Sequence, residues 1–437
     1  MSIPTVLKEY ITQKYFRRFH TRERLDKFQQ KKIQRHLKFV LSHSDFYKKY
    51  FSSFSIKNWT TLPTINKEMM MQYFDELNTV GIQKDEAFQI AFRAEKDREF
   101  SPTINGITIG LSSGTSGNRG LFIVSPRERF RWAGVVLAKL LPGGLLTNHR
   151  IAFFLRANSN LYTTTKSKKI QFSFFDLMDD FGNHVDRLNQ YEPTILVAPP
   201  SMLRFLAETK LAGKLEIDPI KVISVAEVLE DIDKNIISKA FNQKVHQVYQ
   251  CTEGFLGASC EHGTLHMNED IIAVQKEYVD EDEWRFTPII TDFSRTSQPI
   301  IRYHLNDILI ERKESCPCGS PFLAIDRIEG RTDDVFYLRK MEDEELRPIF
   351  PDFFRRAMME SSDYISEYRV IQSSPQLLEI QIKWEKGYNE QKQVEESIHH
   401  LCESFSVSKP EIHFVSYAEQ VKGVKLRRIE RRPFVIE

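Results

Sequence analysis

The sequence predicts an α/β protein: a large amino-terminal domain with mixed, largely parallel sheets, followed by a small α+β domain. Three observations predict this class. Short apolar runs alternate with amphipathic helices over residues 151–249, as in sheets whose strands run parallel. After residue 330, two helices and three strand-like runs follow in another order, which is typical of a separate α+β domain. With 437 residues, the chain is also too long for one compact core.

Composition restricts the class of protein further. The formal net charge is +1, so the chain carries no overall basic surface and we expect no nucleic-acid partner. No apolar stretch is long enough to span a bilayer, and the amino-terminus lacks the apolar core of a signal peptide. Five cysteines in so long a chain do not form a disulfide framework, so we expect a cytoplasmic protein.

The first fifty residues carry a local surplus of positive charge. They hold thirteen Lys and Arg against four Asp and Glu. Two predicted helices, residues 6–20 and 25–41, mix these basic positions with apolar ones at helical spacing. The pattern favours a solvated helix face packed on the larger domain. A weak peripheral contact with anionic lipid or with an acidic partner is the alternative.

A loop poor in bulky side chains follows at residues 111–120, after a short helix predicted at 67–77. Its glycines let backbone N–H groups turn inward, and its hydroxyls add donors, so the loop is suited to hold phosphate. The alternative is a flexible linker. No lysine stands at the Walker A spacing, so the loop is not a P-loop.

The flanks of the loop argue against a linker. Residues 107–109 and 121–124 are apolar, β-branched runs that predict buried strands. Ser125 and Glu128 then stand three apart, with a proline between them, as in the capping box of a helix over residues 125–141. The expected order is strand, loop, strand, helix.

Alternating segments build the predicted sheet, whose ligands would bind beyond the carboxyl ends of the strands. The expected strands are residues 151–155, 170–175, 194–198, 220–225 and 244–249, with helices at 179–191, 200–209 and 229–241. Aromatic side chains on the first two strands and in their connecting loop either line a ligand pocket or fill the strand core. They are Phe153, Phe154, Tyr162, Phe172, Phe174 and Phe175.

Polar side chains follow the last of these strands. Tyr249, Thr252 and Glu253 could stack a base, bond a phosphate and hold Mg²⁺, although an ordinary polar turn has the same composition. Further on, Asp307 is suited to accept two hydrogen bonds from a ribose diol, or is a carboxylate of a surface turn. The α+β domain is expected to hold strands at residues 368–372, 377–384 and 411–415 and helices at 351–360 and 389–404.

Five segments, in this order, resemble motifs of the adenylate-forming (acyl-activating) superfamily. Within it, the resemblance is to the phenylacetate-CoA ligase-like branch, which includes proteins encoded in capsule-polysaccharide clusters. Residues 112–117 match S-S-G-T-[TS]-G, residues 249–253 match Y-G-x-T-E, and residues 299–307 match P-L-I-R-Y-R-T-x-D. Residues 330–334 match G-R-x-D-D, and Lys425 matches the lysine of the carboxyl-terminal G-K-x-x-R.

The resemblance implies the adenylate-forming enzyme fold and an acid–thiol ligase. Residues 1–330 would be the ATP- and carboxylate-binding domain, and residues 331–437 a mobile lid that turns about a hinge at Asp333. A small-molecule carboxylate would attack the α-phosphorus of ATP, giving acyl-AMP and pyrophosphate. The aromatic residues of the first two strands, as an acyl pocket, would fit an aryl or fatty acid. CoA or a carrier protein, or a non-thiol acceptor, would then take the acyl group.

Site residues follow from the resemblance, position by position. The implied catalytic residues are Thr252, Glu253 as the Mg²⁺ ligand, and Lys425, which would enter with the lid. Tyr249 would stack on adenine, beside a segment formed by Ala226 and Glu227. Asp307 and Arg331 would bind the ribose hydroxyls. The phosphates would lie on Ser112, Ser113, Gly114, Thr115, Ser116 and Gly117.

Four soft ligands also suggest a structural Zn²⁺ site. The branch often carries E-C-x-x-x-x-G-L-H and C-x-C-G where this chain has Cys260, His266, Cys316 and Cys318. Such a set suits a closed tetrahedral site without an open catalytic position. His262 is the alternative nitrogen ligand, Cys251 and Cys402 are expected bystanders, and unmetallated cysteines are the alternative to a metal site.

Several positions depart from the family pattern. Asn118 and Arg119 replace the usual Lys-Pro, Gln250 and Val424 each replace a glycine, and residues 304–306 replace Arg-Thr-x. The neighbours Lys422, Arg427 and Arg428 could also supply the cation assigned to Lys425. These departures leave two other functions open: nucleotidyl transfer that leaves AMP on an acceptor, or a nucleotide-binding scaffold with reduced catalysis.

Overall fold

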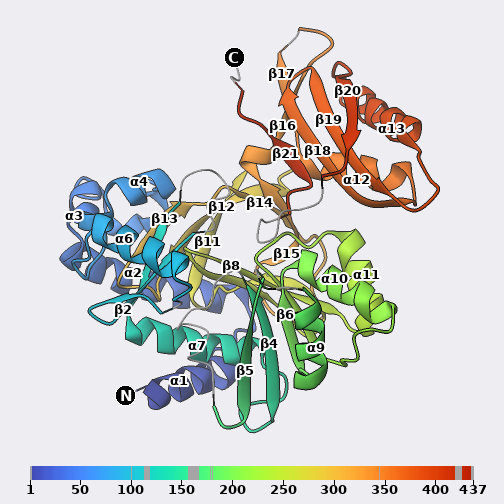
Figure 1. The fold of residues 1–437 in the computed structure, drawn as a ribbon. Helices are drawn as coiled ribbons and strands as arrows, with labels where there is room; N and C mark the ends of the chain where they lie inside the picture. Colours follow the sequence, from blue (N-terminus) through green and yellow to red (C-terminus); the bar gives the residue numbers. More distant parts are fainter. Residues whose placement is uncertain are drawn as a thin grey trace. The chain divides into compact units, whose positions relative to one another are not determined.

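The computed structural model describes residues 2–99, 101–112, 119–155, 167–177, 179, 181–343, 345–418 and 426–434. The chain divides into two compact units. The larger comprises Met1–Leu305 with Leu309–Ile328, and the smaller comprises Asn306–Ile308 with Glu329–Glu437 (Figure 1). The larger unit is built on a mixed sheet and the smaller is α+β, so the predicted fold class is confirmed.

The amino-terminal helices pack on the larger unit, as the favoured interpretation expected. The predicted first helix is shorter: α1 (Ser2–Ile11) gives way to a π-helical segment, η1 (Thr12–Phe16). The Thr21 hydroxyl then caps α2 (Arg22–His43) by accepting from the backbone N–H of Arg24. One face of α2 is buried at helical spacing, with Leu25, Gln29, Ile33, His36, Leu37 and Val40.

Short helices lead to the glycine loop. They are α3 (Asp45–Tyr50), η2 (Ile56–Thr61), α4 (Lys67–Gln72), α5 (Phe74–Leu77) and α6 (Lys84–Lys96). The helix predicted at 67–77 is therefore divided into α4 and α5. Strands β1 (Thr103–Ile104), β2 (Ile107–Leu111) and β3 (Leu121–Val124) form an antiparallel sheet, and α7 (Pro126–Leu140) follows. The order strand, loop, strand, helix is confirmed, and Ser125 and Glu128 form the predicted capping box.

The main sheet holds twelve strands within the described part of the chain. Its parallel half runs β5-β4-β6-β7-β8, and antiparallel strands continue the sheet beyond β8. The parallel strands are β4 (His149–Leu155), β5 (Ile170–Asp176), β6 (Ile195–Ala198), β7 (Lys221–Val225) and β8 (Val245–Cys251). The others are β9 (Gly254–Ser259), β10 (Leu265–Met267), β11 (Ile272–Tyr278), β12 (Arg285–Asp292), β13 (Ile300–His304), β14 (Asp307–Glu311) and β15 (Ala324–Arg331).

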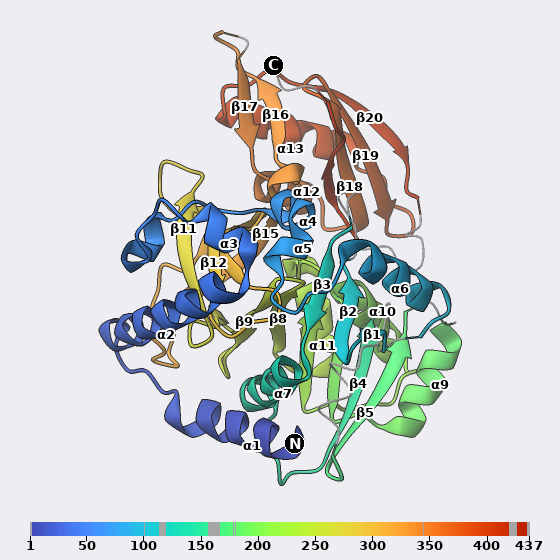
Figure 2. The same ribbon diagram turned by 90° about the vertical axis from the view of Figure 1, so that its left-hand side faces the viewer.

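Helices cover both faces of the parallel half (Figures 1 and 2). On one face, α9 (Phe181–Tyr191), α10 (Pro200–Leu211) and α11 (Asp231–Phe241) pack against a core that includes Phe154 and Phe175. On the other face lie α7 and α1, in a core that includes Tyr10, Leu137 and Phe153. Neighbouring strand residues therefore point into different cores.

The smaller unit has its own core and sheet. It begins with η3 (Thr332–Asp334) and a hairpin of β16 (Phe336–Arg339) and β17 (Leu346–Ile349). A four-stranded sheet follows in the order β20-β19-β18-β21: β18 (Ile365–Ser374), β19 (Leu377–Trp384), β20 (Glu411–Ser416) and β21 (Ile429–Arg431). Helices α12 (Pro351–Ser361) and α13 (Gln391–Ser404) complete the predicted pattern. Among the described residues of both units, no helix is long and apolar enough to cross a membrane.

Candidate active site

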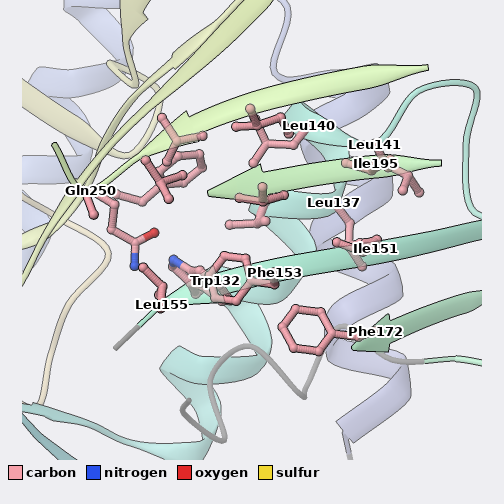
Figure 3. Close-up of a pocket in the computed structure, with 17 residues that line it drawn as sticks. Trp132, Leu137, Leu140, Leu141, Ile151, Phe153, Leu155, Phe172, Ile195 and Gln250 are labelled. Atoms are coloured by element: carbon pink, nitrogen blue, oxygen red, sulfur yellow. The ribbon is translucent and has the colours of Figure 1, made fainter. Parts of the chain in front are cut away.

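An apolar cavity of about 150 Å³ lies between α7 and the parallel half of the sheet (Figure 3). The helix contributes Trp132, Val136 and Leu140, which are spaced four residues apart and so share one face. The strands contribute Ile151, Phe153, Leu155, Phe172, Ile195, Val197, Ile223, Val225 and Val248. Among the lining residues that the structure describes, none has a charged side chain, so the cavity suits an apolar group.

The two faces of β4 and β5 divide the predicted aromatic residues. Phe153 and Phe172 line the cavity, with ring centroids 5.3 Å apart. Phe154 and Phe175 stack 4.6 Å apart in the core on the other face of the sheet, so a pocket role for these two was wrong. The remaining candidates are Phe174, which packs beside the cavity core without lining it, and Tyr162, which lies outside the described residues.

The polar end of the cavity is formed by Ala226 and Gln250, after β7 and near the end of β8. Figure 3 shows the Gln250 amide at the same end as Trp132 and Leu155, away from Leu141 and Ile195. Ala226 has a φ of 69°, and the backbone N–H of Glu227 donates to the Val225 carbonyl at 2.9 Å. This γ-turn is a strained conformation of the kind found at functional sites.

Glu227, the other residue expected near adenine, reaches the start of α10. Its Oε2 accepts from the backbone N–H of Ser201 at 3.3 Å. The predicted Ala226–Glu227 segment therefore joins the cavity to a helix amino-terminus.

The turn between β8 and β9 carries a buried carboxylate. Glu253 is 7% exposed. The Tyr303 hydroxyl donates to its Oε1 at 2.8 Å, and the Thr252 hydroxyl donates to its Oε2 at 2.9 Å. Burial, and then the charge of Glu253, raise the pKa of Tyr303, so that phenol stays protonated as a donor. Each carboxylate oxygen has one hydroxyl donor and keeps capacity for a further ligand.

Tyr249 stands on β8, but it is buried in the largest core of the larger unit. Its strand neighbours Val248 and Gln250 line the cavity, so the Tyr249 side chain lies on the opposite face of the strand. Stacking on adenine would require one face of the ring to become accessible. The assignment therefore stays a prediction.

Arg295 connects the glycine-loop hairpin to this turn, a role that sequence reasoning missed. Its guanidinium donates to the Thr252 carbonyl at 2.6 Å and to the Ile123 carbonyl at 3.2 Å. It also donates to Gln298 Oε1 at 3.0 Å. Only the sequence position between two strand-like runs hinted at this residue, since its partners Thr252 and Ile123 are distant along the chain.

Glu128 also joins the start of α7 to the segment that carries Arg295, through contacts beyond the capping box. Its carboxylate accepts from the Ser125 hydroxyl at 2.7 Å and from the Ser297 backbone and hydroxyl at 2.8 and 2.5 Å. It also accepts from the backbone N–H of Thr296. Burial opposes its ionisation, but the hydrogen bonds from Ser297 and Ser125 outweigh that effect and lower the pKa of Glu128.

The base of the glycine loop is closed by Ser112. Its backbone N–H donates to the Gly120 carbonyl at 2.8 Å, and its hydroxyl accepts from the Gly120 N–H at 2.7 Å. Arg119 donates to the Ser112 carbonyl at 3.2 Å and pairs with Glu95 at 2.5 Å. The other expected phosphate-binding residues lie outside the described residues: Ser113, Gly114, Thr115, Ser116 and Gly117.

The expected ribose-binding pair lies within the smaller unit. Arg331 Nε is 3.8 Å from Asp307 Oδ1, and both side chains are partly exposed. Lys425 and Lys422 lie outside the described residues. Of the competing cations, Arg427 pairs with Asp334, and buried Arg428 pairs with Glu367 at 3.1 Å. Both arginines therefore have structural partners in the smaller unit.

The four predicted metal ligands come together, although they are far apart in sequence. The candidate ligand atoms of Cys260, His266, Cys316 and Cys318 all lie within 4.8 Å of one another. His266 Nδ1 lies 3.2 Å from the Phe322 carbonyl, which leaves Nε2, 3.4 Å from Cys318 Sγ, as the ligand atom. A backbone partner of this kind is common for metal-binding histidines.

The cluster shows which histidine and which cysteines come together, and metal binding by them stays a prediction. His262 is exposed and lies outside the cluster, and partly buried Cys251 and buried Cys402 also lie outside it. Burial opposes ionisation of Cys316, but hydrogen bonds, above all with Thr264, lower its pKa to about 6. Burial raises the pKa of Cys318 to about 12. A cation would favour the thiolate of both residues.

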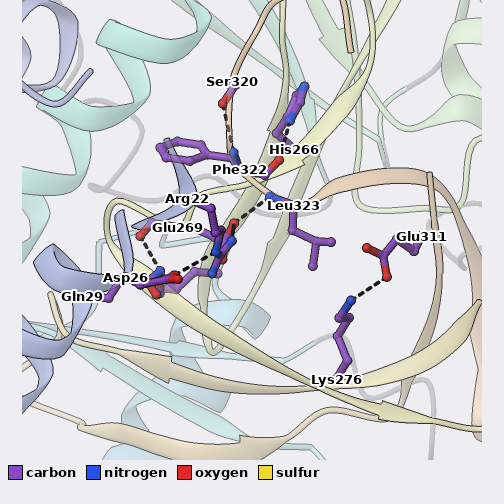
Figure 4. A network of polar contacts seen from close by, with 11 residues as sticks. Arg22, Asp26, Gln29, His266, Glu269, Lys276, Glu311, Ser320, Phe322 and Leu323 are labelled. Atoms are coloured by element: carbon purple, nitrogen blue, oxygen red, sulfur yellow. Dashed lines mark hydrogen bonds and ion pairs between the residues drawn. The ribbon is translucent and has the colours of Figure 1, made fainter. Parts of the chain in front are cut away.

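A polar network fixes this region to α2 (Figure 4). The buried Glu269 carboxylate accepts from Arg22 at 2.7 Å and from the backbone N–H of Leu323 at 2.6 Å. Gln29 donates to the Glu269 carbonyl at 2.8 Å. Because Leu323 follows Phe322, the network holds the segment that positions His266.

Comparison with known proteins supports the fold. No protein-family model matches the chain. Protein CapK of Staphylococcus aureus is 27% identical over 163 residues, which are 36% of this chain and 35% of CapK. The aligned region thus spans about a third of the curated relative that it matches.

Solved structures match over nearly the whole chain. A 2-hydroxyisobutyryl-CoA ligase in complex with 2-HIB-AMP, in its postadenylation state, has a TM-score of 0.71 at 17% identity and covers 94% of this chain and 90% of that one. A GH3.15 acyl acid amido synthetase has a TM-score of 0.58 at 12% identity, covering 90% and 86%. The chain therefore has the fold of adenylate-forming ligases.

Proposed function

We propose that the protein is an ATP-dependent ligase that activates an apolar carboxylic acid as acyl-AMP, releases pyrophosphate and passes the acyl group to a thiol of CoA or a carrier protein. The observation that carries this proposal is the apolar cavity whose polar end includes Gln250, two residues before Thr252 on the same segment. An acid bound with its tail in the cavity would present its carboxylate near the Thr252–Glu253 turn. We further propose a cytoplasmic location, from the cysteine usage.

The chemistry needs positioning and charge neutralisation more than covalent help. A carboxylate oxygen attacks the α-phosphorus of ATP, a new O–P bond forms, and the bond to pyrophosphate breaks. Thr252 would donate to the α-phosphate, and the Glu253 carboxylate would hold Mg²⁺ beside it. Mg²⁺, when bound, neutralises charge on the phosphates. Arg295 would keep the turn in place through the Thr252 carbonyl.

The remaining assignments rest on the motif resemblance. The loop from Ser112 to Gly117 would hold the phosphates, Tyr249 and the Ala226–Glu227 segment would bind adenine, and Asp307 with Arg331 would bind ribose. Lys425 would supply a cation during adenylation.

The volume and the apolar lining of the cavity restrict which acids can bind. An apolar cavity of about 150 Å³ in another protein is known to hold benzene. The cavity here has about the same volume, so we propose an acid whose tail is the size of a phenyl ring or a short aliphatic chain. A charged or hydroxyl-bearing tail would lose its hydration without gaining a partner.

We also propose that Cys260, His266, Cys316 and Cys318 hold a structural Zn²⁺ ion. The three sulfurs and one nitrogen fit a tetrahedral site, and such an ion would join the β9–β10 hairpin to the segment before β15. Elemental analysis of protein purified without chelator should find about one zinc per chain, and Cys316→Ser should lose it. A zinc content below about half an equivalent would contradict the site.

The reaction is tested by pyrophosphate exchange with a panel of aryl and aliphatic acids. We expect exchange to depend on acid and to be fastest with tails of about six carbons. Added CoA should then release AMP. If AMP instead became attached to an acceptor, nucleotidyl transfer would replace the ligase proposal. ATP binding without exchange for any acid would indicate the scaffold alternative.

A further inference from the structure

The segment formed by α1 and η1 exposes an apolar stripe. Leu7, Ile11, Tyr15 and Phe16 have exposed fractions of 44%, 38%, 58% and 76%. Leu7, Ile11 and Tyr15 are spaced four residues apart, which places neighbouring members on one side of a helix. We call these four residues, with the cations that flank them, the amino-terminal surface.

The other side of α1 is firmly packed, so the stripe is held outward. Glu9 and Tyr10 are buried. Gly134 of α7 lets the two helices approach closely, because a Cβ at this position would lie 2.7 Å from the Val6 carbonyl oxygen. The fold of α1 therefore depends on contacts that do not involve the stripe.

Positive charge flanks the stripe. Lys8 and Arg18 are exposed, and Lys14 is half-buried between them. The acid of this segment, Glu9, is buried and pairs with Arg17 at 3.0 Å, so it does not offset those cations. Burial lowers the pKa of Lys221 to about 8, and the charge of Lys14 adds to this shift, so Lys14 lies close to a second cation on this side of the larger unit.

The loop before β4 extends the same edge of the larger unit (Figures 1 and 2). Leu145 packs in the core cluster of Tyr10, and the next residue, Leu146, is 82% exposed. Lys169 donates to the Leu146 carbonyl at 2.9 Å, which adds another cation beside an exposed apolar side chain.

We propose that the amino-terminal surface docks on a lipid bilayer that carries anionic head groups. Aromatic and aliphatic side chains of a surface helix enter the interface, while lysine and arginine contact lipid phosphates. A second copy of the chain fits less well, because a symmetric interface would bring Lys8, Lys14 and Arg18 against the same cations. Charge complementarity thus selects the anionic bilayer.

Docking does not depend on the proposed reaction, but α7 connects the two. One side of this helix packs on α1 through Gly134, and another lines the cavity through Trp132, Val136 and Leu140. The docking surface therefore lies behind the helix that walls the apolar cavity. An acid that partitions into membranes would be concentrated near it.

The test is co-sedimentation of the full chain with vesicles of phosphatidylcholine that contain about 30% phosphatidylglycerol. We expect binding that weakens about tenfold or more in vesicles of phosphatidylcholine alone, and again at about 0.5 M salt. The double variant Ile11→Ser, Phe16→Ser should lose about tenfold in binding because its apolar contact is removed. The matched control is Phe205→Ser, an aromatic residue 47% exposed on α10, which should bind as the parent does.

A second pair, Lys8→Glu with Lys14→Glu, keeps the apolar stripe and removes the attraction to anionic lipid. We expect this variant to lose vesicle binding while its melting temperature stays unchanged. The unchanged melting temperature would show that the loss of binding is not caused by a folding defect. Equal binding by parent and both double variants would overturn the proposal. Failure of the parent chain to bind either kind of vesicle would also overturn the proposal. If the Ile11→Ser, Phe16→Ser variant then lost self-association of the chain, the surface would be an interface between two copies.

Discussion

The apolar cavity and the Glu253 turn share strand β8, but different forces maintain them. The cavity wall consists of apolar side chains, each of which contributes about 1.5–3 kcal/mol to the free energy of folding by its burial. When one of them is shortened, its neighbours can partly fill the space. In the turn, Glu253, Tyr303 and Thr252 satisfy one another, so loss of one leaves a buried polar group without a partner. Substitutions in the cavity should therefore change which acid reacts, and substitutions in the turn whether any acid reacts.

The largest effect is expected for Glu253→Gln. The amide keeps the size of the side chain but removes the charge proposed to hold Mg²⁺, so kcat/KM for pyrophosphate exchange should fall about a hundredfold or more for every acid. Exchange assays with several acids measure this. Glu261→Gln, at an exposed carboxylate, is the matched control. An unchanged rate in the Glu253 variant would remove this residue from the mechanism.

The next largest effect is expected on the free energy of unfolding when Glu128 is replaced. Glu128→Gln should reduce the free energy of unfolding by about 2 kcal/mol at neutral pH, because an amide cannot accept from all the Ser125, Thr296 and Ser297 donors. Urea unfolding measures this. Glu23→Gln, at an exposed carboxylate whose partner Lys27 is also exposed, is the control and should change little.

The same variant tests the lowered pKa of Glu128. A carboxyl whose pKa is lower when folded adds stability above its unfolded value of about 4.3, and this stability is lost as pH falls through the folded pKa. The difference between parent and Glu128→Gln should therefore shrink below about pH 4. A difference that stays constant from neutral to acid pH would show that the charge of Glu128 contributes nothing.

A change of selectivity is expected for Phe172→Ala, which lengthens the cavity. The ratio of kcat/KM for an acid with a larger tail to that for a phenyl-sized acid should rise about tenfold. Phe174→Ala, on the same strand but outside the lining, should leave the ratio unchanged. If both variants changed the ratio equally, the cavity would not be the acyl site.

The smallest effect is expected for Gln250→Ala. This residue stands where related motifs have glycine, and its amide lies at the polar end of the cavity. Removal should change KM for the acid a few-fold and leave KM for ATP unaltered, since one hydrogen bond or contact of about 1 kcal/mol is lost. A selective rise of KM for ATP would instead assign Gln250 to the nucleotide.

Local features were predictable from the sequence because they depend on neighbours along the chain. The hairpin around the glycine loop, the capping box of Ser125 and Glu128, and the alternating strands and helices follow from short-range periodicity and hydrogen bonding. The four metal-ligand candidates were also identifiable, because this chain has cysteine and histidine where the resembling branch carries them. The phosphate-loop residues and Lys425 stay predictions that rest on motif order.

Tertiary structure alone decided which residues share a site. Strand alternation placed Phe153 in the cavity and Phe154 behind it, and helix packing made Trp132 and Val136 part of the wall. The long-range partners of Arg295 and Glu128, and the choice of His266 over His262, depend on strand order and on segments more than fifty residues apart meeting in space. Sequence determines the local propensity of each segment, but which side chains meet is a property of the packed sheet.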